Sequence, residues 1–327
     1  MMAKTHFYLV TLSLMLILSV FSGCLLNNSV EENKILVSSE GNGDYTSIQQ
    51  AIQAESNGSI IQVSSGVYNE QIIVNKSVTL LGSIGGETII QVKPGSHGII
   101  LTKPHSVVNG LIIKNTKLDS DIDFESAGIL IHSQNNTISN CTLMNCTVGI
   151  LIEQNNGNII RNNHFENNGY GIYFVQSSYT LICDNVFENN TEYGGYVYVN
   201  SLFSNITHNI FKGNDCGLRI KSRHNTINKN IFKHNNQGLF LCCSASNNIV
   251  FHNSFIENKL YHAQGNYHDN QWFKPLPVGG NYWDNFAAVD NDNDGISDTI
   301  FVIDPRNVSG VGEKIYDAFP LMNSPFD

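Results

Sequence analysis

The chain has 327 residues, a length that suits one or two ordinary domains or one long repeat solenoid. Only 14% of its residues are charged and its formal net charge is −10, so it lacks the basic excess that nucleic acid or anionic lipid headgroups require. We therefore expect no nucleic-acid partner, whereas cations and neutral sugars are compatible with this charge balance.

Residues 1–23 predict a lipoprotein signal peptide. Lys4 precedes an apolar run from Phe7 to Phe21, and two small residues stand directly before Cys24. This ending resembles the lipobox of bacterial and some archaeal lipoproteins, so we expect a lipid on Cys24 and a protein held outside the cytoplasm, at a membrane or the cell surface. As a helix the run spans about 22 Å, short of a roughly 30 Å hydrocarbon core, which disfavours a retained membrane helix. Ordinary secretion is the other alternative.

A linker is predicted for residues 24–42 and a solenoid for residues 43–279. The solenoid opens on a short amphipathic helix over 46–54, with Ile48 and Ile52 on one face. A helix here would cover strand edges that would otherwise invite association. The segments IIQVS, VYNEQIIV and VTLLGS are then predicted to start the coils.

A repeat of about 22 residues follows, with three landmarks in one phase. A glycine opens each unit: Gly128, Gly149, Gly171, Gly195, Gly217 and Gly238. An Asn-x-Phe pair comes next: Asn163/Phe165, Asn185/Phe187, Asn209/Phe211, Asn230/Phe232 and Asn253/Phe255. A further Asn stands three residues after each Phe: Asn168, Asn190, Asn214, Asn235 and Asn258. Chance does not produce three such landmarks over five units.

This repeat predicts an all-β fold, a single-stranded right-handed parallel β-helix with a short N-terminal capping helix. The apolar runs are too short for helices, and one unit cannot bury a core unless others stack on it. Stacked units form parallel sheets with about 4.8 Å between strands. Asn at the corners tolerates left-handed backbone and can bond to the equivalent Asn one coil away. We therefore predict that Asn209 is buried and paired with both neighbours.

Six cysteines remain after Cys24, and no CxxC pair predicts a zinc knuckle or a redox site. Most are expected to be small buried apolar residues. Cys141 and Cys146 take the two Asn positions of their coil, so we interpret them as members of the Asn ladders.

One outer face of the solenoid is predicted to carry aromatic side chains. Alternation sends the second residue after each glycine outward. In the GGYVYV coil we take Gly194 as the equivalent glycine, since valine packs better inside and tyrosine keeps its hydroxyl in water. The predicted carbohydrate-binding residues are Tyr173, Tyr196, Tyr198, Arg219 and Phe240, flanked by His132, Glu153 and Lys221. An ordinary half-exposed sheet or a protein interface is the alternative.

Residues 280–327 abandon the repeat and are predicted to form a C-terminal cap with a calcium loop. Gly295 permits the sharp turn, and hard oxygen ligands suit calcium rather than copper. The predicted ligands are Asp290, Asp292, Asp294, Asp298 and the carbonyl of Ile296. Phe301 replaces the bidentate Glu of an EF-hand, so the loop is more similar to the Asp-rich loops of extracellular modules. A solvated acidic turn is the alternative.

These segments together resemble the NosD-type β-helix family, within the pectate-lyase-like superfamily. The resemblance is carried by the opening IQQAI…SVTLLG, the coils with GI and N-x-F, and the ending GNYWDNF…DNDNDGISDTIFVID…YDAFPLM. It covers most of residues 43–322. It implies the β-helix fold, and it brings two functional expectations: handling of carbohydrate, and the copper role for which the family is named.

We predict a surface lipoprotein that binds polysaccharide or glycoconjugate, or acts as a scaffold. A polysaccharide-processing enzyme of lyase, hydrolase or epimerase type is one alternative. Arg219-Ile220-Lys221 matches a polygalacturonase motif, but the paired carboxylates and histidine of those enzymes are missing, so no catalytic residue is assigned. A copper-binding accessory protein is the other alternative, although His208 and His252 lie two coils apart and only His262 and His268 could converge.

Overall fold

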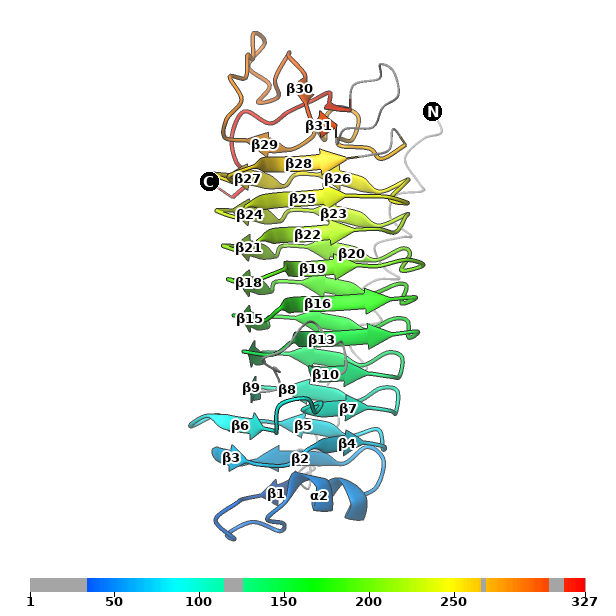
Figure 1. Ribbon diagram of the computed structural model, residues 1–327, viewed down its shortest axis with the longest axis vertical. Helices are drawn as coiled ribbons and strands as arrows, with labels where there is room; N and C mark the ends of the chain where they lie inside the picture. The colour runs from blue at the N-terminus through cyan, green and yellow to red at the C-terminus, as the bar shows by residue number, and fades with distance from the viewer. Residues whose placement is uncertain (1–33, 115–125, 266–268, 306–314, 327) are drawn as a thin grey trace, which may run out of the picture. The chain divides into compact units, whose positions relative to one another are not determined.

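The computed structural model describes residues 34–114, 126–265, 269–305 and 315–326. Three ten-stranded sheets, here named A, B and C, wind around one axis, and every pairing within them is parallel (Figure 1). Successive coils add strands to the sheets in turn, so strands adjacent in a sheet come from neighbouring coils. The prediction of an all-β, right-handed parallel β-helix is confirmed.

The strands follow in chain order within each sheet. Sheet A contains β1 (Lys34–Val37), β2 (Ile60–Val63), β5 (Thr79–Leu81), β8 (Val107–Asn109), β11 (Thr137–Ser139), β14 (Ile159–Arg161), β17 (Leu181–Cys183), β20 (Asn205–Thr207), β23 (Thr226–Asn228) and β26 (Ile249–Phe251). Sheet B contains β3 (Gly66–Tyr68), β6 (Thr88–Gln91), β9 (Ile112–Lys114), β12 (Thr142–Met144), β15 (His164–Glu166), β18 (Val186–Glu188), β21 (Ile210–Lys212), β24 (Ile231–Lys233), β27 (Ser254–Ile256) and β29 (Tyr282–Trp283). Sheet C contains β4 (Ile72–Val74), β7 (Ile99–Leu101), β10 (Ala127–Ile131), β13 (Val148–Glu153), β16 (Tyr170–Val175), β19 (Tyr193–Val197), β22 (Cys216–Ile220), β25 (Gln237–Leu241), β28 (Tyr261–Gly265) and β31 (Asp304–Pro305).

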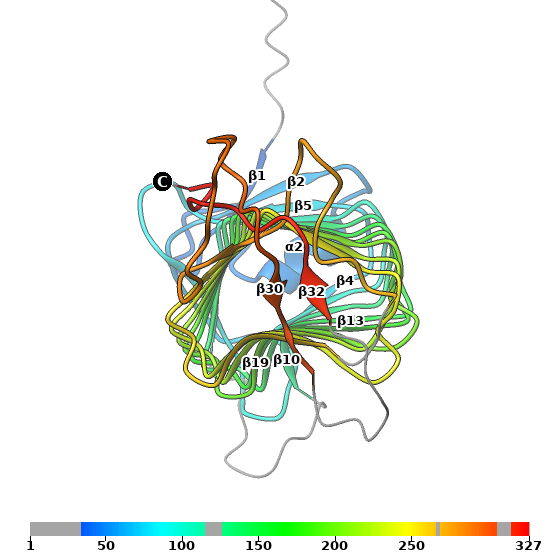
Figure 2. The same ribbon diagram turned by 90° about the horizontal axis from the view of Figure 1, so that it is seen from above.

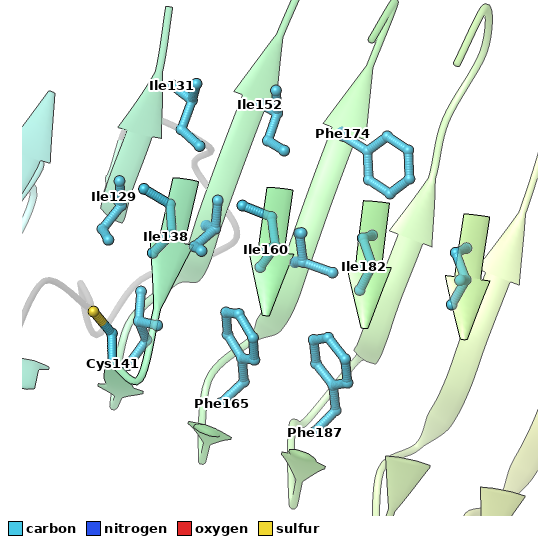
Figure 3. Packing of buried hydrophobic residues seen from close by; sticks show 14 of the residues in the cluster. Ile129, Ile131, Ile138, Cys141, Ile152, Ile160, Phe165, Phe174, Ile182 and Phe187 are labelled. Atoms are coloured by element: carbon cyan, nitrogen blue, oxygen red, sulfur yellow. The ribbon is translucent and has the colours of Figure 1, made fainter. Parts of the chain in front are cut away.

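The interior of the coils is a continuous apolar column. Viewed along the axis, the three sheets surround a common centre (Figure 2). The side chains that point inward from them form one apolar core. The repeated phenylalanines stack at ring-centroid distances of 4.6 to 5.0 Å, as Phe165 and Phe187 illustrate in Figure 3. Trp283 continues the stack at 4.3 Å from Phe255. Phe187, Phe211 and Phe232 therefore each meet a phenylalanine above and below, as the repeat predicts.

Two Asn ladders run along the corners of the coils. The first contains Asn163, Asn185, Asn209, Asn230, Asn253 and Asn281, and the second contains Asn168, Asn190, Asn214, Asn235 and Asn258. Fully buried Asn209 donates from its backbone nitrogen (3.0 Å) and from Nδ2 (2.9 Å) to Oδ1 of Asn230. Its own Oδ1 accepts the same two bonds from Asn185. The prediction for Asn209 is confirmed.

The cysteines at ladder positions behave as expected. The backbone nitrogens of Cys141 and Cys146 each donate to the Oδ1 of an Asn in the next coil, at 2.9 Å. Both thiols are buried, and all six cysteines of the described chain are free. Burial raises the pKa of Cys141 to about 11, which keeps this thiol protonated.

Both of these Asn ladders end beside an ionisable group near the C-terminus. Asp317 Oδ2 accepts from the backbone nitrogen of Asn281 (2.7 Å) and from the Trp283 indole (3.1 Å). Burial raises the pKa of Asp317 to about 6. In the second ladder, Asn258 Nδ2 lies 3.2 Å from Nδ1 of His262, whose Nε2 lies 2.8 Å from Asp284. The final amide of each ladder therefore keeps a partner.

A helix covers the N-terminal end of the solenoid, as predicted. Helix α2 (Ile48–Ala54) begins two residues later than expected, because the Ser47 side chain caps it by accepting from the Gln50 nitrogen. Its buried residues are Ile48, Ala51 and Ile52. A capping residue has non-helical backbone, which excludes residues 46 and 47 from the helix.

The solenoid extends beyond both predicted boundaries. Strand β1 lies in the segment 24–42 that was expected to be a linker, and it pairs in parallel with β2. Its apolar sequence ILV completes sheet A. At the other end, β29 and β31 come from the predicted cap 280–327 and extend sheets B and C. The cap also contains the small antiparallel pair β30 (Phe301–Val302) and β32 (Tyr316–Asp317).

Within the residues that the structure describes, no helix has both the length and the apolar character needed to cross a membrane. The predicted signal peptide 1–23 and Cys24 lie outside these residues.

Candidate functional site

The outer side of sheet C brings the predicted aromatic residues together. One outward column runs through Leu130, Leu151, Tyr173, Tyr196, Arg219 and Phe240, each paired with the next coil. Tyr196 pairs with Tyr173, and Val197 is fully buried in the core. The register that takes Gly194 as the equivalent glycine is therefore confirmed.

A second outward column adds two tyrosines that the sequence analysis missed. Tyr170 and Tyr193 directly precede the glycines of β16 and β19 and pair with each other. A Cβ on Gly171 would point inward, 2.7 Å from Cδ1 of Phe187, and Ile172 is also in the core. Two successive inward positions interrupt the alternation, which leaves the residue before each glycine on the outer side. The sequence could have revealed Tyr170 and Tyr193 only through a tyrosine that stands directly before the glycine in two consecutive coils.

We call the resulting surface the tyrosine face. It consists of Tyr170, Tyr173, Tyr193, Tyr196, Tyr198, Arg219, Lys221 and Phe240. Neighbouring rings lie 5.1 to 6.5 Å apart in tilted, edge-on and stacked arrangements. Such distances are those of favourable aromatic pairs, so the rings support one another in fixed orientations.

Arg219 organises one end of the tyrosine face. Its Nη1 donates to the Tyr193 hydroxyl at 2.6 Å, and its Nε donates to Cys242 Sγ at 3.2 Å. The guanidinium carbon lies 5.0 Å from the ring centroid of Tyr196. Lys221 Nζ similarly lies 4.8 Å from the ring centroid of Tyr198. Both cations are thus held against aromatic rings, an attractive arrangement.

The predicted residues differ in how far a ligand could reach them. Tyr196 and Phe240 are only 9% and 6% exposed, because neighbouring rings and the Arg219 side chain lie over them. Tyr173, Tyr198 and Lys221 are half-buried and keep accessible surface. Burial raises the pKa of Tyr173 to about 12, so its phenol stays neutral and able to donate a hydrogen bond. Tyr196 and Phe240 therefore form the floor, and the accessible contacts lie beside them.

A histidine–glutamate pair flanks the tyrosine face on the neighbouring coils. His132 Nε2 lies 2.9 Å from Glu153 Oε2, and both side chains are accessible to solvent. Glu153 pairs with Val175 of β16, two residues beyond Tyr173. The expected flanking positions of His132 and Glu153 are confirmed.

The acidic loop brings three of its predicted calcium ligands together. Carboxylate oxygens of Asp290, Asp292 and Asp294 lie within 4.8 Å of one another. Repulsion by Asp294 raises the pKa of Asp292. The turn uses left-handed backbone at Gly295, with φ of 86°, as predicted. Asp290 is held from inside the loop, because its two oxygens accept from the backbone nitrogens of residues 293 and 295 at 2.7 and 3.0 Å.

The other two predicted ligands are arranged differently. Asp298 Oδ2 accepts from the backbone nitrogen and from Nδ2 of Asn291, both at 2.7 Å, instead of joining the acidic trio. Ile296 forms an isolated antiparallel bridge with Leu321. Amide donors therefore satisfy the Asp298 carboxylate where the prediction placed a cation.

The histidines and thiols of the described chain do not fit a copper site. His208 and His252 follow the expected corner column with Lys229 between them, each in left-handed backbone. His262 is engaged by Asn258 and Asp284, and His268 lies outside the described residues. Apart from the acidic trio, the described ranges contain no group of three His, Cys, Asp or Glu side chains close enough to share an ion.

Comparisons with known proteins agree with this fold. A curated relative, probable pectinesterase 67 of Arabidopsis thaliana, is 31% identical over 109 residues, which are 29% of this chain and 32% of that protein. The match thus spans about a third of the relative's own length. The crystal structure of an alginate lyase from Paenibacillus sp. str. FPU-7 has a TM-score of 0.52 at 13% identity and covers 76% of this chain and 97% of its own. A pectin methylesterase from Aspergillus niger has a TM-score of 0.41 at 11% identity and covers 65% and 84%.

At 13% identity the alginate lyase shows a shared fold alone. The sequence model of the family described as periplasmic copper-binding protein (NosD) matches residues 26–220 and 83–288. These ranges overlap and together cover more than half of the 327 residues. The chain belongs to the NosD family of parallel β-helix proteins.

Proposed function

We propose that this NosD-family protein is held outside the cytoplasm by a lipid on Cys24 and binds polysaccharide or glycoconjugate through the tyrosine face. The observation that carries the proposal is the convergence of five tyrosines from adjacent coils with Arg219 and Lys221 on one outer surface. A cluster of this kind is more than a sheet needs for stability, since the other outer positions of the repeat are mostly small, polar or aliphatic.

The chemistry of the tyrosine face suits sugars. Aromatic rings pack against the apolar C–H faces of sugar rings, while neutral phenols and ammonium groups bond to hydroxyls and carboxylates. Tyr173 and Tyr198 offer accessible ring surface, and Lys221 stands beside Tyr198. The names of pectinesterase and alginate lyase relatives refer to polysaccharides, which supports the same ligand class.

A binding assay tests this proposal. The full chain, purified in detergent, would be run in native gels that contain polygalacturonate, alginate or xylan. We expect retardation by at least one polymer, and about tenfold weaker binding for Tyr198→Ala. Tyr282→Ala, which removes a half-buried tyrosine from sheet B, is the matched control and should bind normally. Loss of binding in both variants, or in neither, would contradict the site.

A second candidate is processing of the bound glycan. The observation that favours it is the His132–Glu153 pair, an accessible acid–base pair beside Tyr173. The appearance of new reducing ends or of unsaturated products after incubation with the polymer would support this candidate. Their loss in Glu153→Gln, with binding retained, would assign the chemistry to this pair. Binding without new ends favours a binding module, and no binding at all favours a scaffold.

We also propose that the acidic trio of Asp290, Asp292 and Asp294 binds calcium. Three clustered carboxylates provide hard oxygen ligands, and the loop backbone already adopts the necessary sharp turn. A cation would relieve the repulsion that raises the pKa of Asp292. The side chain of Asp298 would complete the shell only by leaving Asn291.

The lipid anchor has its own test. Cys24→Ser should abolish labelling with a radioactive fatty acid and release the protein from the membrane fraction. Unchanged membrane association would favour a retained apolar helix instead.

A further inference from the structure

A row of exposed aromatic side chains stands at the turn that leads from sheet C to sheet A. Tyr179, Phe203 and His224, here called the aromatic ridge, occupy equivalent positions in three consecutive coils. Their ring centroids are 5.4 Å apart between Tyr179 and Phe203 and 5.3 Å between Phe203 and His224, with nearly parallel planes. Backbone bonds from Tyr179 to Leu202 and from His224 to Ser246 fix this register.

The backbone of this column does not favour aromatic residues. The column runs Asn135, Gly157, Tyr179, Phe203, His224 and Asn247, with φ of 57°, 71°, 57°, 55°, 59° and 53°. Left-handed backbone suits Gly and Asn, which fill the flanking coils, whereas Tyr and Phe adopt it at a cost in free energy. Tyr179 and Phe203, in two successive coils, therefore depart from the residue types that left-handed backbone prefers. His224 belongs to a residue type that is enriched there, as does His105, which precedes Asn135 in the same column.

The side chains of Tyr179 and Phe203 are also exposed to solvent. Tyr179 is 63% exposed and Phe203 is 51% exposed, so neither ring is part of the core. Strained and solvent-exposed aromatic residues do little for the stability of the solenoid beyond contact with one another. Local strain of this kind is typical of sites that act on something outside the fold.

The surroundings of the aromatic ridge indicate which ligand it suits. The turn segments 154–157, 176–179, 200–203 and 222–225 contain no Asp or Glu, although the chain carries a net charge of −10. Arg223 is exposed beside His224. Amide and hydroxyl groups are ordered at the rim: Asn156 Oδ1 accepts from the Ser178 nitrogen at 2.7 Å, and Ser178 Oγ accepts from the Leu202 nitrogen at 3.0 Å. Rings with neutral polar neighbours and one cation fit a neutral or anionic sugar.

The aromatic ridge and the tyrosine face occupy the same coils. In one coil, Tyr173 lies on sheet C and Tyr179 lies at the corner that follows it. Tyr198 and Phe203 are arranged in the same order in the next coil. We propose that the aromatic ridge is a second carbohydrate contact, which holds a polysaccharide chain that leaves the tyrosine face and bends around this corner. This inference rests on the proposed function of the tyrosine face. It makes the protein selective for polymers, because only a long chain reaches both surfaces at once.

Asn substitutions test the aromatic ridge without endangering the fold. Tyr179→Asn combined with Phe203→Asn installs the residue that Asn135 and Asn247 already provide in this column, so the melting temperature should stay the same or rise. Affinity for whichever of polygalacturonate, alginate or xylan binds wild type should fall about tenfold, while affinity for its tetrasaccharide stays unchanged. Leu260→Asn, at a residue 64% exposed on another part of the surface, is the control and should alter neither affinity.

The outcomes separate the two proposals. Unchanged polymer affinity in the double Asn variant would overturn the aromatic ridge and leave the tyrosine face standing. Reduced polymer affinity in the double Asn variant, with no effect of Tyr198→Ala, would refute the tyrosine face and, with it, the role of the aromatic ridge as a second contact. If wild type binds none of the three polymers, both proposals fall.

Discussion

The inner and outer sides of the same strands follow different rules. Inside, Phe187 meets Phe165 below and Phe211 above, so one residue type serves coil after coil. Outside, the column through β16, β19 and β22 changes from Tyr173 to Tyr196 to Arg219. Repetition is what stacking requires, since each coil must match its neighbours. An outer column that departs from repetition therefore points to recognition of something else.

The largest effect is expected for breaking an inner ladder. Asn209→Leu leaves the backbone nitrogen of Asn185 without its acceptor in a fully buried corner. It also removes the hydrogen bonds that Asn209 Nδ2 donates to Ile182, Thr207 and Asn230. At about 1–3 kcal/mol for the stranded nitrogen and about 1 kcal/mol for each of the three lost hydrogen bonds, the free energy of unfolding should fall by about 4–6 kcal/mol. Urea unfolding measures this loss. Asn205→Leu, at an exposed position of β20, is the control, and an equal loss there would show that the ladder has no special importance.

The next prediction concerns the glycine that occupies an inward-facing position in the strands of sheet C. In Gly171→Ala the new Cβ would lie 2.4 Å from the carbonyl oxygen of Gly194 and 2.7 Å from Cδ1 of Phe187. Backbone cannot give way as a side chain can, so we expect a loss of about 3 kcal/mol. Gly85→Ala meets nothing within 4 Å and should leave the melting temperature unchanged. Equal melting temperatures for wild type and Gly171→Ala would refute this explanation of the repeat.

The end of the first ladder should respond to pH. Because burial raises the pKa of Asp317 to about 6, the native state holds an extra proton between about pH 4 and pH 6, compared with an unfolded Asp at about 3.9. The free energy of unfolding should therefore fall as pH rises through this window, by about 2–3 kcal/mol in total. Asp317→Asn does not titrate, so the difference between wild type and variant isolates the effect. Identical pH dependence in both proteins would show that Asp317 does not act this way.

The smallest effect belongs to the acidic loop. A site with a Kd of about 0.5 mM would stabilise the native state by about 1.4 kcal/mol in about 5 mM calcium. The melting temperature should rise in calcium and fall in chelator, and Asp292→Ala with Asp294→Ala should remove this response. Asp298→Asn tests the fourth carboxylate separately. If this variant keeps the rise in melting temperature with calcium, Asp298 is not a calcium ligand and stays with Asn291. A wild-type protein with the same melting curve in calcium and in chelator has no such site.

The predictability of each feature follows from how often it repeats. The Phe stack, the Asn ladders and the register of Tyr196 could be predicted because five or more coils carry equivalent residues at the same position of the repeat. Strand β1 and the ladder end at Asp317 occur once, and Asp317 lies 36 residues from its partner Asn281, so no period reveals them. Tyr170 and Tyr193 were missed for a third reason: simple alternation places them incorrectly, because the strand has two successive inward positions at each glycine.

The most direct test of the central claim is a crystal structure of the protein with an oligosaccharide of whichever polymer it binds. We predict sugar rings packed on Tyr173 and Tyr198, with a hydroxyl or carboxylate group of the sugar within hydrogen-bond distance of Lys221 Nζ. The floor formed by Tyr196 and Phe240 should stay in place. An oligosaccharide bound on sheet A or sheet B, with the tyrosine face empty, would contradict the account.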